Sequence, residues 1–284
     1  MMAVPTIAEL EAASLNYKRK LLTLAHVSGG MHVGGDLSLA EILVALYYRV
    51  MKVDPKNPDW PGRDYFVLSK GHCAGGLFTV LADLGFFDEN ELRTTYQKLD
   101  AKYGMHPCRK AIGVETATGS LGHGLSITNG MALAAKLDGA DNMFYCVLGD
   151  GELHEGSVWE AAMSGAQFKL DNVVAIVDRN GMSLDGFTEE LMALEPLDKK
   201  WESFGWNTVV VDGHDMGAMV RALEGARRRN GKPTVIIART VKGHGIPFME
   251  NDPDWHAGTV DSAMLQKCFA MLEAARNGKG DANG

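Results

Sequence analysis

The sequence predicts an α/β fold built around a mostly parallel β-sheet. Two short apolar runs, residues 143–148 and 173–177, are rich in β-branched or aromatic residues and are followed by Gly, Asp or Asn. Such runs are typical of buried strands in a parallel sheet. The segment between them is long enough for a crossover helix. The two strands and their connection therefore form a βαβ unit, and the carboxyl ends of both strands meet at one edge of the sheet.

The remaining elements can be placed in order along the chain. Thr6-Ile7-Ala8-Glu9 is a capping-box pattern, and the apolar spacing after it predicts a helix over residues 6–26. A glycine-rich turn at 28–35 leads to a second capped helix from Ser38 to about Met51. Further strands are predicted at 63–69, 207–215 and 234–240, further helices at 88–99, 125–137, 216–229 and 262–275, and an irregular polar segment at 185–199.

Composition limits the classes of function. The chain has 284 residues and 46% hydrophobic content, which is enough for a large core. The 28 Lys and Arg are mostly dispersed among 36 Asp and Glu, so no nucleic acid partner is expected. We expect no membrane span, because no apolar run approaches about 20 residues. The N-terminus does not resemble a signal peptide, and four separated cysteines suit reduced thiols, so we expect a cytoplasmic protein.

Two polar residues follow the paired strands of the βαβ unit. Asp150 follows the first strand and Asn180 follows the second. The fold predicts that these residues lie close together although they are thirty positions apart in the sequence. A carboxylate and an amide oxygen suit Mg²⁺, which usually completes its shell with phosphate and water. The sequence therefore predicts a site for a metal-bridged diphosphate.

A dinucleotide-binding turn also places glycines between a strand and a helix. Gly149, Gly151 and Gly156 do not have the G-x-G-x-x-G spacing. Asp150 is crowded by other acids, and like charges about 4 Å apart repel by about 4 kcal/mol at an effective dielectric of about 20. Without a cation, this turn would repel a pyrophosphate. For either residue alone, a helix cap at Asp150 or a turn at Asn180 is as good an interpretation as a metal ligand.

Gly149-Asp150-Gly151 with Asn180 resembles the thiamine diphosphate motif, and residues 151–161 resemble its transketolase version. From about residue 10 to 258 the chain is similar to the N-terminal subunit of a split transketolase. The resemblance implies a thiamine diphosphate-binding fold with helices on both faces of the sheet. It also implies a diphosphate-type domain over residues 1–258, a C-terminal helix over 259–276 and a disordered tail at 277–284.

The resemblance also assigns site residues and cofactors. It implies thiamine diphosphate with Mg²⁺, or another divalent cation such as Ca²⁺ or Mn²⁺. The metal ligands would be Asp150, Asn180 and the backbone carbonyl of Met182. The residues implied in catalysis are His32, His72, His106 and His256, and those implied in cofactor binding are His72, Gly119, Leu121, Gly151, Glu155, Asn180, Lys242 and His256.

The chain departs from the family pattern at several of these turns. Val33 stands where proline is usual, Met105 replaces a glycine before His106, and His123 replaces a glutamine. Methionine precedes both His32 and His106. We expect Met31 and Met105 to make the donor pocket more apolar or differently shaped.

The implied activity is that of a transketolase-type transferase (EC 2.2.1). Such an enzyme moves a two-carbon ketol unit from a ketose phosphate to an aldose acceptor. Family members in one chain are about twice this length, so a C-terminal subunit carrying the pyrimidine-binding domain would complete an α₂β₂ assembly, and this chain alone would be inactive. The alternatives are the α subunit of a 2-oxoacid dehydrogenase and a non-catalytic regulatory subunit of the same fold.

Overall fold

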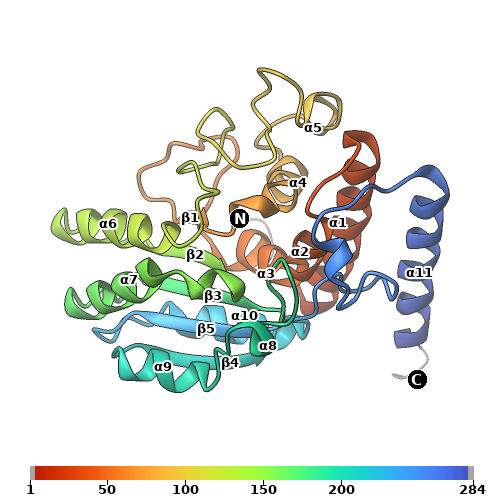
Figure 1. Ribbon diagram of the computed structural model, residues 1–284. Helices are drawn as coiled ribbons and strands as arrows, with labels where there is room; N and C mark the ends of the chain where they lie inside the picture. Colours follow the sequence, from red (N-terminus) through yellow and green to blue (C-terminus); the bar gives the residue numbers. More distant parts are fainter. Residues whose placement is uncertain (1–3, 281–284) are drawn as a thin grey trace.

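The computed structural model describes residues 4–280 and confirms the α/β fold (Figure 1). Within this range the chain forms a five-stranded sheet in the order β1-β2-β3-β5-β4, with every adjacent pair parallel. The strands are β1 (Tyr65–Leu68), β2 (Phe144–Gly149), β3 (Val173–Arg179), β4 (Asn207–Asp212) and β5 (Thr234–Arg239). The predicted βαβ unit is therefore present at the centre of the sheet.

Both faces of the sheet are covered by helices, as predicted. Tyr145 and Val147 of β2 face one core, and Phe144, Cys146 and Leu148 face the other, because side chains alternate along a strand. In Figure 1 the second face is covered by α6 (Gly124–Leu137), α7 (Gly156–Gln167) and α9 (Leu197–Ser203).

The first core is the larger one and is closed by the N-terminal helices. Its helices are α1 (Ile7–Ser28), α2 (Val33–Ser38), α3 (Ala40–Ala45), α4 (Ala74–Leu84), α5 (Glu89–Thr95), α10 (Met216–Ala226) and α11 (Ser262–Gly280). The capping box predicted for α1 is formed, since Thr6 and Glu9 bond each other's backbone N–H groups. No helix among residues 4–280 is long and apolar enough to cross a membrane.

Several local predictions were wrong. The glycine-rich turn predicted at 28–35 ends earlier, because α2 begins at Val33. Glycine is needed inside this helix, since a Cβ on Gly34 would lie 2.5 Å from the carbonyl oxygen of Trp255. The segment 185–199 contains α8 (Thr188–Leu191) and the start of α9. Helix α11 continues past residue 276, and residues 281–284 of the predicted tail lie outside the described range.

Short helical turns also lie between the longer helices and strands. A π-helical turn, Leu46–Val50, follows α3, so the helix predicted to reach Met51 is not α-helical in its last part. Three 3₁₀ turns span Gly71–Cys73, Gly151–His154 and Pro253–His256. The first two follow β1 and β2 directly and place their side chains at the carboxyl edge of the sheet.

Candidate active site

The carboxyl ends of β2 and β3 bring the predicted metal ligands to one place. Gly149 pairs with Asp178 across the two strands, and the Asp150 N–H donates to the Asp178 carbonyl (3.3 Å). One oxygen of Asp150, Oδ2, accepts from the N–H of Gly181 (2.6 Å), the residue that follows Asn180. Asp150 and Asn180 therefore share one hydrogen-bonded edge, as the sequence predicts.

Hydrogen bonds order the turn that carries Asn180 and Met182. Asn180 Oδ1 accepts from the Met182 N–H (3.0 Å), and Asn180 Nδ2 donates to Asp178 Oδ2 (3.2 Å). The Met182 carbonyl oxygen lies 3.7 Å from the position that a Cβ on Gly151 would take, so this turn packs against the residue after Asp150. Asp150, Asn180 and the Met182 carbonyl all offer oxygen atoms, which is the donor type that Mg²⁺ selects.

Asp150 is buried, and its negative charge is balanced by Arg179. Burial raises the pKa of Asp150, and Arg179 Nη1, which donates to Oδ2 at 2.9 Å, opposes that shift. The other oxygen, Oδ1, accepts only the N–H of Gly151 (2.8 Å) among the described contacts. Since each carboxylate oxygen can accept two bonds, Oδ1 keeps a lone pair for a cation.

A second buried ion pair involves Asp178, the residue before Arg179 on β3. Lys70 Nζ is 2.5 Å from Asp178 Oδ2, and both residues are almost fully buried. Burial alone would raise the pKa of Asp178, but Lys70 and the hydroxyls of Ser38 and Thr240 bring it below its ordinary value. The pair fixes the loop after β1 to the end of β3.

Glu152 is a third buried carboxylate that we did not predict as a site residue. It accepts from the Ser69 hydroxyl, from the Gly122 N–H (2.9 Å) and from the Gly149 N–H (3.0 Å). It therefore holds the loops after β1, before α6 and after β2 against one another. The signal that would have found it is the acidic crowding of the turn after β2.

Carboxylates and cations are packed together at this edge. The buried carboxylates are those of Asp150, Glu152 and Asp178, and the cations beside them are Lys70, Arg179 and Lys242. Among the described contacts, Asp150 Oδ1 accepts a single N–H, so this carboxylate oxygen has room for a cation. Together with the oxygens of Asn180 and Met182, the donor set therefore fits a metal such as Mg²⁺.

The four predicted catalytic histidines converge from four separate segments. The ring of His32 lies 5.2 Å from that of His72, 6.3 Å from that of His106 and 5.2 Å from that of His256, measured between centroids. The rings of His72 and His256 are 5.3 Å apart. Nδ1 of His32 is buried and has no hydrogen-bond partner among the described residues, which points to a bound polar ligand.

Three of these imidazoles, those of His32, His72 and His256, are held in the neutral form. Burial lowers the pKa of His72 well below its ordinary value, with Lys70 adding to the effect. Burial and then Lys242 lower the pKa of His256 to about 4, and burial lowers that of His32. A neutral imidazole can both accept and donate a proton, which is the property required for general acid–base catalysis at hydroxyl groups.

Lys242 joins the histidine cluster to the segment after β3. Its Nζ lies 3.0 Å from His256 Nδ1 and donates to the Ser183 carbonyl (3.2 Å). Burial and the nearby Lys70 lower the pKa of Lys242 to about 8. At neutral pH it is therefore mainly cationic, beside the edge where the sequence places a diphosphate.

The glycine loops allow close contact between neighbouring loops at this edge. Gly119 has a positive φ of 141°, and a Cβ there would lie 2.8 Å from the His106 ring. A Cβ on Gly151 would lie 2.9 Å from that of Ser183. Leu121 is half-buried between these loops, whereas Glu155 is exposed and its side chain contacts Gly122. The structure thus puts the predicted cofactor residues around one edge, with Glu155 on its outer rim.

The expectation that Met31 and Met105 shape the donor pocket stays a prediction, and the two side chains differ in exposure. The Met31 side chain is 2% exposed and belongs to the first core, where it lies over Gly75. Its backbone pairs with Gly258 in both directions (3.0 and 2.9 Å), which turns the side chain inward. Met105 is 40% exposed and remains accessible, and His123 is exposed at the start of α6.

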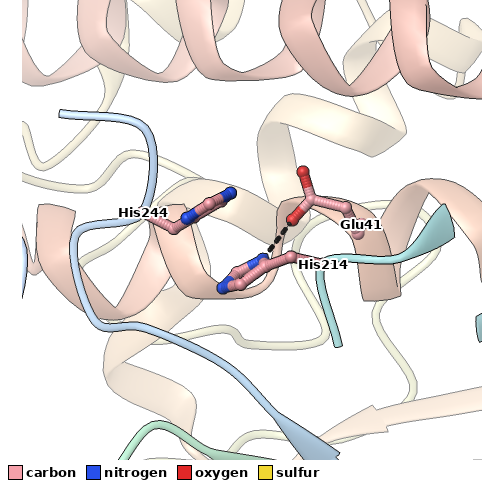
Figure 2. Close-up of side chains that lie close together, drawn as sticks. All are labelled: Glu41, His214 and His244. Carbon is pink, nitrogen blue, oxygen red and sulfur yellow. Dashed lines mark hydrogen bonds and ion pairs between the residues drawn. The ribbon is translucent and has the colours of Figure 1, made fainter. Parts of the chain in front are cut away.

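A second histidine cluster lies in a groove of about 830 Å³ that is lined by α1, α11 and the loop around Gly245. Figure 2 shows His214 pointing at Glu41, with His244 stacked on it at 3.5 Å between ring centroids. The Val241 N–H donates to His214 Nε2 (2.8 Å), so Nδ1 carries the proton that is donated to Glu41 (2.8 Å). Neither nitrogen of His214 keeps a lone pair for a metal.

The comparisons identify the family. The model of the transketolase thiamine diphosphate-binding domain matches residues 12–271. The chain is 48% identical over 250 residues to an apulose-4-phosphate transketolase subunit from Actinobacillus succinogenes, covering 87% of this chain and 90% of that protein. It is 44% identical over 261 residues to the 6-deoxy-6-sulfo-D-fructose transketolase subunit SqwG of a Clostridium species, covering 91% and 94%.

The solved structures agree with the sequence comparisons. Transketolase from Campylobacter jejuni superposes with a TM-score of 0.85 at 32% identity, covering 93% of this chain and 43% of that one. Transketolase from Leishmania mexicana gives the same TM-score at 26% identity, covering 96% and 41%. This chain belongs to the transketolase family and consists largely of its thiamine diphosphate-binding domain.

Proposed function

We propose that this chain is the N-terminal subunit of a two-chain transketolase. The enzyme moves a two-carbon ketol unit from a ketose phosphate to an aldose acceptor. The observation that carries the proposal is the meeting of an acidic strand edge, suited to a metal, with a cluster of four histidines. Relatives of nearly the same length that are named as transketolase subunits support it.

Within this proposal, Asp150, Asn180 and the Met182 carbonyl hold Mg²⁺, Ca²⁺ or Mn²⁺. Lys242, which is mainly cationic at neutral pH, would contribute to holding the diphosphate of the cofactor. The other cofactor contacts are those of His72, Gly119, Leu121, Gly151, Glu155, Asn180 and His256. Thiamine diphosphate, when bound, supplies the electron sink that makes cleavage beside a carbonyl feasible.

The histidines then act on the sugar. Because His32, His72 and His256 are neutral near pH 7, each can accept a proton from a substrate hydroxyl or donate one back. His106 reaches the same space from the loop opposite His32. The substrates in the names of the relatives, apulose 4-phosphate and 6-deoxy-6-sulfo-D-fructose, support a small ketose with an anionic tail as the donor class.

A partner chain completes the enzyme in this proposal. It is the C-terminal subunit with the pyrimidine-binding domain, in an α₂β₂ assembly. The word subunit in the names of the relatives supports this. So does a strip of exposed apolar side chains beside the proposed metal site: Leu184, Phe187, Leu191 and Met192.

We place the enzyme in the cytoplasm. Its four cysteines are free, which suits a reducing compartment.

The test is to purify the chain from its host through an affinity tag and identify the chains that copurify. We expect one partner of roughly 300 residues, the size of a pair of domains, and ketol transfer that needs both chains, thiamine diphosphate and Mg²⁺. Turnover by this chain alone would contradict the need for a partner. A complex that binds the cofactor without turning over any ketose phosphate would instead favour the non-catalytic alternative.

A further inference from the structure

Arg179, the last residue of β3, binds groups from both sides of the proposed metal site. Its side chain is 9% exposed. Nη1 donates to Asp150 Oδ2 (2.9 Å) and to the Thr188 hydroxyl (2.7 Å). Nη2 donates to Glu189 (2.7 Å) and to Glu195 (3.2 Å). One guanidinium therefore joins Asp150, a proposed metal ligand directly after β2, to the segment 181–195.

The segment 181–195 carries another proposed ligand, the Met182 carbonyl. Most of its residues are exposed, and its buried apolar side chains are those of Met182 and Leu194. Polar contacts also hold it. Thr188 N–H donates to the Gly181 carbonyl (2.9 Å), Leu194 N–H donates to Glu189 (3.0 Å), Lys242 Nζ donates to the Ser183 carbonyl (3.2 Å), and His154 Nε2 lies 2.8 Å from the Met192 carbonyl. Two of these polar anchors, Thr188 and Glu189, are partners of Arg179.

The positive charge of Arg179 has two opposing effects on a nearby cation. Like charges repel, so removal of the guanidinium alone would favour metal binding. Its hydrogen bonds, however, hold the ligands in place. Arg179 uses Oδ2 of Asp150, together with the Gly181 N–H, and leaves Oδ1 available. A cation can therefore bind through Oδ1 while Arg179 stays in place.

We infer that Arg179 is a positioning residue that fixes Asp150 and the segment 181–195 together, so that order in this segment and divalent-cation binding are linked. This rests on the proposed function. The fork geometry of arginine is essential, since lysine keeps the charge but cannot donate to four partners at once. Metal binding in turn makes the segment more rigid, because Met182 and Asp150 then bind the same cation.

The experiment measures Mn²⁺ binding in the presence of thiamine diphosphate by the electron paramagnetic resonance of free Mn²⁺, on the assembly purified through a tag on this chain. We expect Arg179→Gln and Arg179→Lys each to weaken binding about 10-fold or more, the usual effect of losing a group that orients a ligand. The control is Arg49→Gln, which removes a distant ion pair with Glu224 and should leave Mn²⁺ affinity unchanged.

Hydrogen exchange gives a readout that does not need the metal. In the metal-free assembly we expect faster exchange over residues 181–195 in both Arg179 variants, and no change there in Arg49→Gln. If the Arg179 variants fail to fold, Thr188→Val removes one partner of the guanidinium at nearly constant volume. Thr188→Val should also weaken Mn²⁺ binding and speed hydrogen exchange over residues 181–195.

Two results overturn the inference. One is equal or tighter Mn²⁺ binding in Arg179→Gln, which would show that charge outweighs positioning. The other is unchanged exchange over residues 181–195. Failure of the proposed function is distinguishable, because it would appear in the wild-type assembly as no Mn²⁺ binding with thiamine diphosphate at all.

Discussion

Lys70 Nζ lies 2.5 Å from Asp178 Oδ2 in a place where neither residue is exposed by more than 2%. This pair lies directly beneath the acidic edge and connects the loop of His72 to β3. Buried pairs of this kind contribute modestly as pairs but are costly to break on one side, because the remaining charge is left uncompensated.

Lys70→Met should therefore destabilise the protein strongly. We expect a loss of about 3–5 kcal/mol in the free energy of unfolding, measured by urea denaturation. Lys199→Met is the matched control, because Lys199 pairs with Glu202 on the exposed surface and its loss should leave the free energy of unfolding nearly unchanged. Equal losses in the two variants would contradict the structural role of the buried pair.

Asp150→Asn should weaken divalent-cation binding without unfolding the protein. The amide keeps the shape of the side chain but removes the charge that a cation needs, so Mn²⁺ affinity should fall by more than the roughly 10- to 100-fold typical of residues behind the ligands. Glu160→Gln, an exposed position on α7, serves as the control. Unchanged Mn²⁺ affinity in Asp150→Asn would exclude it as a ligand.

The depressed pKa of His256, about 4, predicts a difference in acid stability. Between about pH 6.5 and 4, the unfolded chain binds a proton at this residue that the folded chain does not. Its contribution to stability is complete above pH 6.5 and is lost as the pH falls through 4. Wild type should lose on the order of 1–3 kcal/mol more than His256→Asn on acidification, as urea denaturation at each pH will show.

Lys242, with a pKa of about 8, should make cofactor binding sensitive to alkaline pH. The proposed diphosphate binds the cationic form, so affinity should decline as the pH rises above 8. Lys242→Arg keeps its charge at every accessible pH and should flatten this decline. Calorimetric titration of thiamine diphosphate with Mg²⁺ at pH 7 and 9 measures both. If the affinity for thiamine diphosphate falls equally in wild type and Lys242→Arg, a group other than Lys242 causes the pH dependence.

Met31 and Met105 should respond differently to truncation. Met31→Ala leaves a cavity in the first core and should cost about 2–5 kcal/mol of stability. Met105→Ala should change stability by less than about 0.5 kcal/mol, because this side chain is exposed. If Met105 contacts the donor, its truncation will change the KM for ketose phosphates. A large loss of stability in Met105→Ala would contradict its exposed position.

The sequence by itself determined the local elements and one long-range relation. The Thr6 capping box, the apolar runs of β2 and β3 and the helical spacing of α1 depend on neighbours within a few residues, so they can be recognised without coordinates. The proximity of Asp150 and the turn at Asn180 followed from one rule, because parallel strands joined by a crossover end on the same side.

The tertiary structure alone decided which side chains pair at that edge. Lys70 and Asp178 are 108 positions apart, and their contact requires the loop after β1 to reach past β2 to β3, for which the sequence has no periodic signal. The inward turn of Met31 depends in the same way on its bridge to Gly258. Periodicity and motifs report the local chain, whereas charge compensation and burial depend on segments that only folding brings together.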